Sequence, residues 1–131
     1  MVTKRHVIEI LYTERCRYVS LAVARVREAL ALLGAELDVE IRLILVSSFG
    51  EAVARRFRGS PTVRVDARDV ETRPGAVAPI GLMARGYVVD AKIERAPSAN
   101  AVRCALELAI AEERSRLGRE DVLAAGVEAA P

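Results

Sequence analysis

The chain has 131 residues, of which 52% are hydrophobic, and this size and composition favour a single folded domain over a disordered chain. Its 20 basic and 18 acidic residues are interspersed and leave a net charge of only +2, which removes the long-range attraction on which nucleic-acid binding depends. No segment approaches the roughly twenty apolar residues of a membrane span, and the basic N-terminal stretch lacks the apolar run of a secretion signal, so we expect a cytoplasmic protein with no nucleic-acid partner and no membrane partner.

The first predicted elements are a strand and a helix. Residues 7–12 are apolar at nearly every position and rich in β-branched side chains, as in a strand that is covered on both faces of a sheet. In residues 18–33, apolar side chains recur every three or four positions, which predicts an amphipathic helix that Gly34 ends. The strand is therefore expected at the centre of the sheet.

A second strand and a short helix come next. Apolar and polar residues alternate at the start of residues 37–46 and the run then turns wholly apolar, which predicts a strand that is solvated at first and buried later. Ser48 and Glu51 have the spacing of a capping box at the start of a helix. Val53 and Phe57, four positions apart, are expected to share one face of that helix.

The C-terminal half contains a predicted hairpin, a long connection and a last helix. Residues 62–65 and 69–71 are typical of two short strands that reverse between them. Residues 72–97 are rich in proline and glycine and have no helical period, and the segment GYVVD within them is a candidate extra strand. Ser98 is expected to cap a final helix that ends near Leu117.

The predicted elements follow the order β-α-β-α-β-β-α. Two parallel strands joined by a right-handed helical crossover, followed by an antiparallel hairpin, predict an α/β fold with a mixed four-stranded sheet and helices on both faces. We expect a single domain over residues 1–117 and a weakly structured C-terminal tail over residues 118–131.

Two stretches of the sequence carry a resemblance to a known family. ILYTERCRYVS, residues 10–20, places Cys16 between the first strand and the first helix, and RFRGSPTVRVDARDVE, residues 56–71, opens the third strand with Gly-Ser-Pro-Thr. With the order of elements, these stretches resemble the thioredoxin-like superfamily over roughly residues 5–117. GSPTVRVDARDVE followed by GLMARGYVVD is similar to a group of small bacterial thioredoxin-like proteins sometimes labelled as related to alkylmercury lyases.

The sequence departs from this family at the redox centre. Thioredoxin-like oxidoreductases carry a C-x-x-C pair, but the fourth position here is Val19, and Ala84 stands where the resemblance implies a cysteine in GLMxR. A dithiol cycle cannot run on Cys16 alone, because no neighbouring thiol resolves its mixed disulfide. Two functions stay open: a binding or scaffold module that retains the fold, or alternatively a single-cysteine, glutaredoxin-like redox protein that uses Cys16.

The resemblance implies a site where the third strand begins. Cys16 is the candidate catalytic residue, with its thiolate favoured by the start of the helix and the flanking arginines, and the alternative is an unreactive thiol in a vestigial site. The Ser60–Pro61 bond is expected to be cis and to lie against this thiol, whereas a trans proline that merely begins a strand is the alternative. The Ser60 backbone would pair with an extended client protein or with a small thiol such as glutathione. The candidate substrate-binding residues are Ser60, Pro61, Thr62 and Arg17.

The remaining candidate residues have simpler interpretations. Cys104 is expected to be a small buried hydrophobe with no disulfide to Cys16. His6, the only histidine, is expected to be solvated, and we expect no metal ion and no other cofactor. An exposed edge strand is a candidate surface for a homodimer. A cluster of arginines around the third strand is more often a solvated face than a site for a carboxylate or phosphate; its members are Arg55, Arg56, Arg58, Arg64, Arg68 and Arg73.

Overall fold

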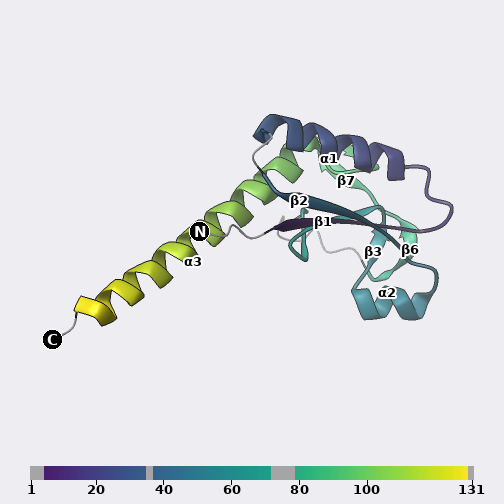
Figure 1. Ribbon diagram of the computed structural model, residues 1–131. Coiled ribbons are helices and arrows are strands. Elements are labelled where there is room, and N and C mark those ends of the chain that lie inside the picture. Colours follow the sequence, from purple (N-terminus) through teal and green to yellow (C-terminus); the bar gives the residue numbers. More distant parts are fainter. Residues whose placement is uncertain (1–4, 35–36, 72–78, 130–131) are drawn as a thin grey trace.

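A computed structural model (Figure 1) describes residues 5–34, 37–71 and 79–129, with side chains described as far as residue 120. These residues form eight strands and three helices. In chain order they are β1 (His6–Tyr12), α1 (Val19–Leu33), β2 (Val39–Leu45), α2 (Phe49–Arg55), β3 (Arg58–Ser60), β4 (Thr62–Val65), β5 (Arg68–Asp69), β6 (Gly81–Ala84), β7 (Tyr87–Val89), β8 (Lys92–Glu94) and α3 (Ala99–Ala129).

The central sheet has four strands in the order β2-β1-β4-β5. β1 runs parallel to β2, from the pair His6 and Val39 to the pair Tyr12 and Leu45, and antiparallel to β4. β4 and β5 form the antiparallel hairpin. The predicted α/β fold with a mixed four-stranded sheet and a central first strand is therefore confirmed.

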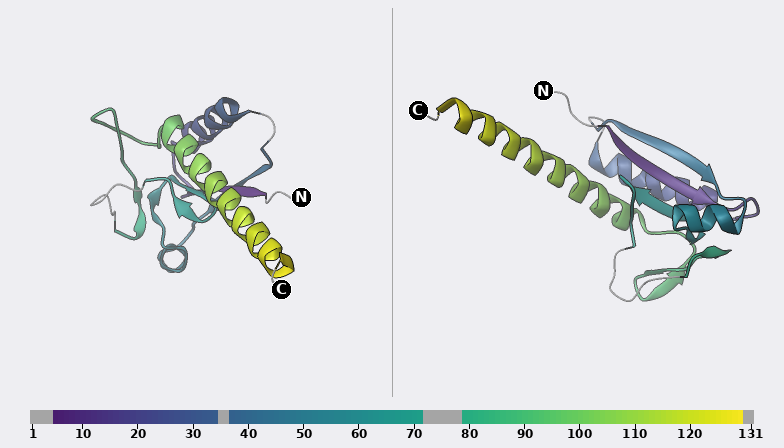
Figure 2. Two further views of the ribbon diagram at one scale, coloured as in Figure 1. Left: turned by 90° about the vertical axis from the view of Figure 1, so that its left-hand side faces the viewer. Right: turned by 90° about the horizontal axis from the view of Figure 1, so that it is seen from below.

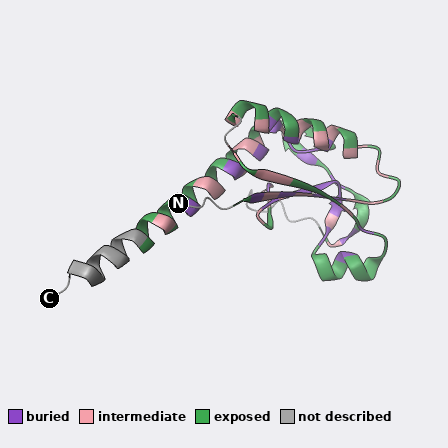
Figure 3. Ribbon diagram, in the orientation of Figure 1, coloured by how far each residue is buried: buried purple, intermediate pink, exposed green. Residues whose placement is uncertain are grey.

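Helices cover both faces of this sheet, as predicted. Figure 2 shows that α1 and α3 lie together on one face, whereas α2 lies on the other. Successive residues of β1 point to opposite faces, so Ile8 and Ile10 join the core under α1 and α3, whereas Leu11 packs with Ala52 of α2 and with Phe57. The buried positions in Figure 3 follow this arrangement through the sheet and the inner faces of α1 and α3.

β2 differs from its prediction. It is a terminal strand of the sheet, and Ile41, Leu43 and Leu45 on one face are 36%, 54% and 42% exposed. On the other face Ile44 packs against Leu11 and its neighbours, and Val46, directly after the strand, is 1% exposed. The expected burial of the later residues is therefore confirmed for Val46 and wrong for Leu43 and Leu45, because a strand that pairs on one side only leaves outer side chains partly in solvent.

α2 begins as predicted and ends earlier than its apolar spacing indicates. The Ser48 hydroxyl accepts a hydrogen bond from the Glu51 amide at 3.1 Å, and the Glu51 carboxylate accepts one from the Ser47 amide. Arg56, with φ of 52°, then ends the helix in the left-handed region. Because the chain turns there, Phe57 is fully buried while Val53 stays exposed, so the predicted shared helix face is wrong.

The segment after β4 contains more structure than expected. β5 begins after a tight turn in which Asp66 and Ala67 have φ of 47° and 70°, so the predicted hairpin is confirmed with a shorter turn. In the predicted long connection, residues 72–78 lie outside the described part of the chain. The rest contains β6, which pairs with β3 in parallel, and the β7–β8 hairpin, so GYVVD does contribute a strand.

α3 begins where predicted and continues further. The Ser98 hydroxyl caps it by accepting a hydrogen bond from the Ala101 amide at 3.0 Å. Its first half packs against α1 and β4, and the helix then extends away from the sheet to Ala129 (Figure 1), so the predicted end near Leu117 is wrong. No helix in the described part of the chain combines the length and the apolar character needed to cross a membrane.

Candidate functional site

Cys16 lies in the loop between β1 and α1. Its amide donates a hydrogen bond to the Thr13 carbonyl at 3.0 Å, and its side chain is partly exposed. α1 begins at Val19, so Arg17 and Tyr18 separate Cys16 from the first helical residue. Cys16 therefore precedes the helix and does not belong to its first turn. Arg17 is exposed in the same loop.

The Ser60–Pro61 bond is cis, as predicted, and it lies at the same end of the sheet as the cysteine loop. The Ser60 hydroxyl accepts a hydrogen bond from the Thr13 amide at 3.0 Å, directly after β1. Ser60, Pro61 and Thr62 are all buried. We refer to residues 59–62 as the bend. The bend thus contacts the loop that carries Cys16 and Arg17, and of the two only the loop is accessible to solvent.

The carbonyl of Ser60 has a hydrogen-bond partner within the chain. Its carbonyl accepts a hydrogen bond from the Arg85 amide at 3.0 Å, in continuation of the parallel pairing between β3 and β6. Ala84 is the direct pairing partner of Ser60. Within the chain, the Ser60 carbonyl therefore already has a backbone partner, whereas pairing of the Ser60 backbone with a peptide or glutathione stays a prediction.

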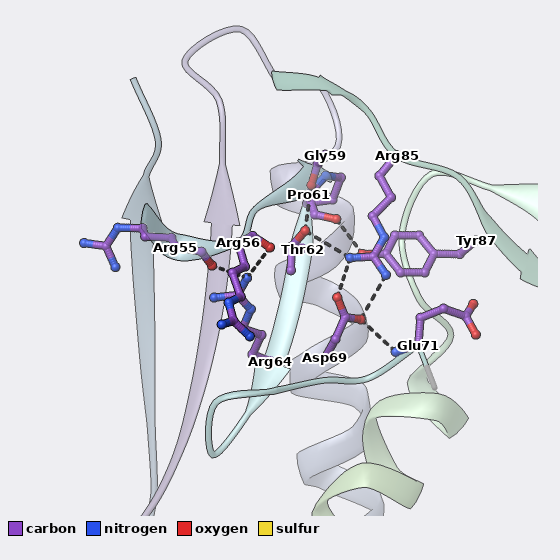
Figure 4. A network of polar contacts seen from close by, with 10 residues as sticks. All are labelled: Arg55, Arg56, Gly59, Pro61, Thr62, Arg64, Asp69, Glu71, Arg85 and Tyr87. Carbon is purple, nitrogen blue, oxygen red and sulfur yellow. Dashed lines mark hydrogen bonds and ion pairs between the residues drawn. The ribbon is translucent and has the colours of Figure 1, made fainter. Parts of the chain in front are cut away.

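A buried arginine forms the centre of a polar network around the bend (Figure 4). The Arg85 side chain is 4% exposed and makes a bidentate ion pair with Asp69, at 2.6 and 2.9 Å. Its Nη1 also donates to Thr62 Oγ1 at 3.1 Å, and the Thr62 hydroxyl donates to the Gly59 carbonyl at 2.6 Å. Burial lowers the pKa of the Arg85 guanidinium, but the hydrogen bond to Asp69 and the neighbouring charges outweigh burial and raise it overall.

Tyr87 lies beside Arg85 and also contacts the bend (Figure 4). Its hydroxyl donates to the Pro61 carbonyl at 2.6 Å, and its ring lies 4.6 Å from the Arg85 guanidinium carbon, in a cation–π contact. Burial raises the pKa of the Tyr87 phenol well above its usual range, so the hydroxyl stays protonated and remains a donor. The carbonyls of Gly59, Ser60 and Pro61 are thus all hydrogen bonded within the chain.

Sequence reasoning missed Arg85, Asp69 and Tyr87. The available signal was the segment GLMARGYVV, in which a single charged residue interrupts an otherwise apolar run. A charge in such a place is expected to have a buried partner. The partner, Asp69, lies in the hairpin and is not identifiable from the spacing alone.

Gly59 gives a test of how tightly this bend is packed. Its φ is +107°, and an added Cβ would lie 3.0 Å from both the Arg85 Cβ and the Met83 carbonyl oxygen. We expect Gly59→Ala to lower the free energy of unfolding by about 2 kcal/mol, measured by urea denaturation. Gly34→Ala is the matched control, because Gly34 also has positive φ but an added Cβ meets nothing within 4 Å. If both variants lose the same free energy of unfolding, the residues around Gly59 are not closely packed.

Two members of the arginine cluster near the third strand, Arg64 and Arg68, contact other parts of the chain. Arg64 donates to the carbonyls of Arg55 and Arg56 at 2.7 and 3.0 Å, which satisfies the end of α2 (Figure 4). Burial lowers the pKa of Arg64. Arg68 pairs with Glu112 of α3 at 2.9 Å, and Arg73 lies outside the described residues.

His6 and Cys104 both differ from their predictions. His6 is 3% exposed, with Nδ1 at 2.7 Å from Asp66 Oδ2 and Nε2 at 3.0 Å from Glu113 Oε2, so the expectation of a solvated histidine is wrong. Cys104 is exposed on α3, where it lines a groove of about 760 Å³ between this helix and the β4–β5 hairpin. Both cysteines are free, as predicted.

No known protein family, curated protein or solved structure matches this sequence. Within the described part of the chain, no three histidine, cysteine or carboxylate side chains gather in a way that suits a metal ion. The interpretation of the site therefore depends on its own geometry. That geometry shows a partly exposed thiol in a loop that is hydrogen bonded, through the Thr13 amide, to a buried bend whose three carbonyls have partners within the chain.

Proposed function

We propose that this protein is a thioredoxin-like binding module in which dithiol exchange has been lost. Three features support the thioredoxin-like assignment: the strand order β2-β1-β4-β5, the cis Ser60–Pro61 bond before β4, and the cysteine in the loop after the central strand. The hydrogen bond from the Thr13 amide to the Ser60 hydroxyl joins the last two features at one end of the sheet.

The second thiol is missing at both positions where the resemblance implies one. Val19 is the first residue of α1, in the fourth position of the C-x-x-C pattern. Ala84 pairs directly with Ser60, so a cysteine at that position would lie beside the bend, and alanine supplies no thiol. A mixed disulfide on Cys16 therefore has no resolving partner at these two positions.

The observation that carries the proposal is the occupied carbonyl of Ser60. Main-chain pairing of an extended peptide requires unpaired backbone groups at a strand edge. Here the Arg85 amide occupies the carbonyl, and the bidentate pair between Arg85 and Asp69 holds that segment in place. The bend consequently stabilises the domain and does not receive a client by strand addition.

Exposed apolar side chains near the bend provide a different surface for a client protein. Phe49 and Val53 of α2 are 62% and 50% exposed, and Leu82 and Met83 of the neighbouring β6 are 40% and 44% exposed. Clustered apolar side chains on a surface are typical of protein interaction sites, and methionine adapts to varied partners. The client is therefore expected to present an apolar surface.

The experiment that tests the loss of chemistry compares wild-type protein with Cys16→Ser. Both proteins are given a glutathionylated peptide and reduced glutathione, and release of the peptide thiol is followed with time. We expect the same rate as the uncatalysed reaction in both cases. Cys104→Ser serves as the matched control because it removes the other exposed thiol. Catalysed release that disappears only in Cys16→Ser would refute the proposal.

The alternative function is a single-cysteine thiol-disulfide redox protein, and the partial exposure of Cys16 favours it. In that reaction the Cys16 thiolate attacks the glutathionyl sulfur, and the client leaves as a free thiol. A second glutathione thiolate then attacks the mixed disulfide, which restores Cys16 and yields oxidised glutathione. The same assay supports this function if the wild-type rate exceeds the uncatalysed rate.

A further inference from the structure

We propose that a second copy of this chain binds along the outer edge of β2, antiparallel to it and related by a two-fold axis centred on Ile41. The two four-stranded sheets would then form one continuous sheet. The proposal concerns β2 only, goes beyond the function proposed above and does not depend on it.

In the described sheet, the backbone amides and carbonyls on the outer side of β2 have no neighbouring strand with which to pair. The His6 amide donates to the Asp38 carbonyl and the Val46 amide donates to the Tyr12 carbonyl, so the even-numbered residues direct their backbone groups towards β1. In a strand the direction alternates, and the odd-numbered residues 39, 41, 43 and 45 therefore direct theirs away from β1. β2 is terminal in the described sheet, keeps its register with β1 throughout, and contains neither proline nor glycine.

The charges of β2 favour the register centred on Ile41. Glu40 and Arg42 flank Ile41, so pairing centred on Ile41 places Glu40 of each copy opposite Arg42 of the other. A centre on Glu40 or on Arg42 would instead place like charges opposite one another. Because the odd residues make the new hydrogen bonds, each Glu40–Arg42 pair falls at a non-hydrogen-bonded position, where side chains approach most closely.

Within one copy, these two charged groups already interact in solvent. Arg42 donates to Glu40 at 3.0 Å, and this hydrogen bond lowers the pKa of Glu40 and raises the pKa of Arg42. Both groups are therefore charged over the neutral range. In the dimer, each Glu40 would pair with Arg42 of the other copy in place of Arg42 of its own copy. Each charged group would therefore keep a neighbour of opposite charge.

The apolar face of β2 supports the same register. Val39, Ile41 and Leu43 point to the side of the sheet that α1 covers, where Val39 contacts the main core. Beside Val39 lies a recess of about 430 Å³ lined by Leu30, Ala31, Gly34, Leu37 and Val39. In the proposed pairing Leu43 of the second copy lies opposite Val39, and Leu45 lies opposite Leu37. Leu43 and Leu45 of one copy would thus enter the apolar recess of the other copy, and the two-fold axis would repeat this contact in the opposite direction.

Charge reversal tests both the dimer and its register. We expect light scattering with gel filtration, from about 1 to 500 µM, to give twice the mass of the 131-residue chain at high concentration. Glu40→Arg alone and Arg42→Glu alone each create two like-charge pairs, so each should raise the dissociation constant about tenfold or more. The double variant E40R/R42E, and an equimolar mixture of the two single variants, should restore the wild-type affinity.

Amide exchange locates the interface independently of the charges. As the protein concentration rises, the amides of Val39, Ile41 and Leu43 should exchange more slowly, while those of Glu40 and Arg42, which face β1, should not change. Circular dichroism checks that every variant is folded. A monomer at all concentrations, single variants that dimerise as the wild type does, or a double variant that stays weakened would each overturn the proposal.

Discussion

Replacing Asp69 with alanine is expected to lower the free energy of unfolding by about 3 kcal/mol, because removing one partner of a buried ion pair leaves the other charge uncompensated. The partner is the Arg85 guanidinium, and the Arg85 side chain is only 4% exposed. The change also removes the carboxylate that accepts the Glu71 amide at 2.9 Å. Urea denaturation followed by circular dichroism measures the loss.

Asp38→Ala is the matched control for this prediction. Asp38 pairs with Arg5 at 3.0 Å, but both side chains are more than half exposed, so its loss should stay within about 0.5 kcal/mol. The double variant Asp69→Leu with Arg85→Met should recover most of the stability, because it removes both charges together. Similar losses for Asp69→Ala and Asp38→Ala would mean that the network around the bend contributes little to stability.

His6→Ala is expected to lower the free energy of unfolding by a similar amount, about 3 kcal/mol. The imidazole lies between the carboxylates of Asp66 and Glu113 and joins β1, the β4–β5 turn and α3. The two ring nitrogens lie within hydrogen-bond distance of both carboxylates, so His6→Ala removes a buried partner that Asp66 and Glu113 share. Thermal and urea unfolding measure the change.

The control for His6→Ala is Arg103→Ala, on the exposed side of the same helix. Arg103 pairs with Glu107 in i,i+4 spacing, and such exposed pairs contribute only about 0.3–0.5 kcal/mol. Amide exchange adds a local measurement: in His6→Ala the α3 amides near Glu113 should exchange faster, since the helix loses a contact with β1. If α3 exchanges at its wild-type rate, His6 does not anchor this helix.

Stability and binding use different parts of the proposed site. Gly59, Ser60, Pro61 and Thr62 are held by Arg85 and Tyr87 and are buried. The exposed groups, including the Cys16 thiol and the apolar side chains of α2 and β6, lie outside that network. Variants of the exposed groups should therefore alter partner binding without the loss of stability expected for Asp69→Ala.

The sequence by itself determined the features that depend on neighbouring residues. A continuous apolar run located β1 and apolar periodicity located α1, and the hydroxyls of Ser48 and Ser98 cap α2 and α3 as predicted. The two short strand-like segments on either side of Asp66 were enough to predict the β4–β5 hairpin. In each case the contacts that form the element lie within a few residues along the chain, so the local pattern records them.

Only the tertiary structure decided the features that join distant segments. Alternation in β2 does not reveal that the strand is terminal, since that depends on which strands lie beyond it. Arg85 finds Asp69 across 16 positions and His6 finds Asp66 across 60, and in each pair the Arg85 or His6 side chain is only 4% exposed, so this contact replaces water as its partner. Such partners are set by how the elements pack, and packing also pairs the Ser60 carbonyl with the Arg85 amide.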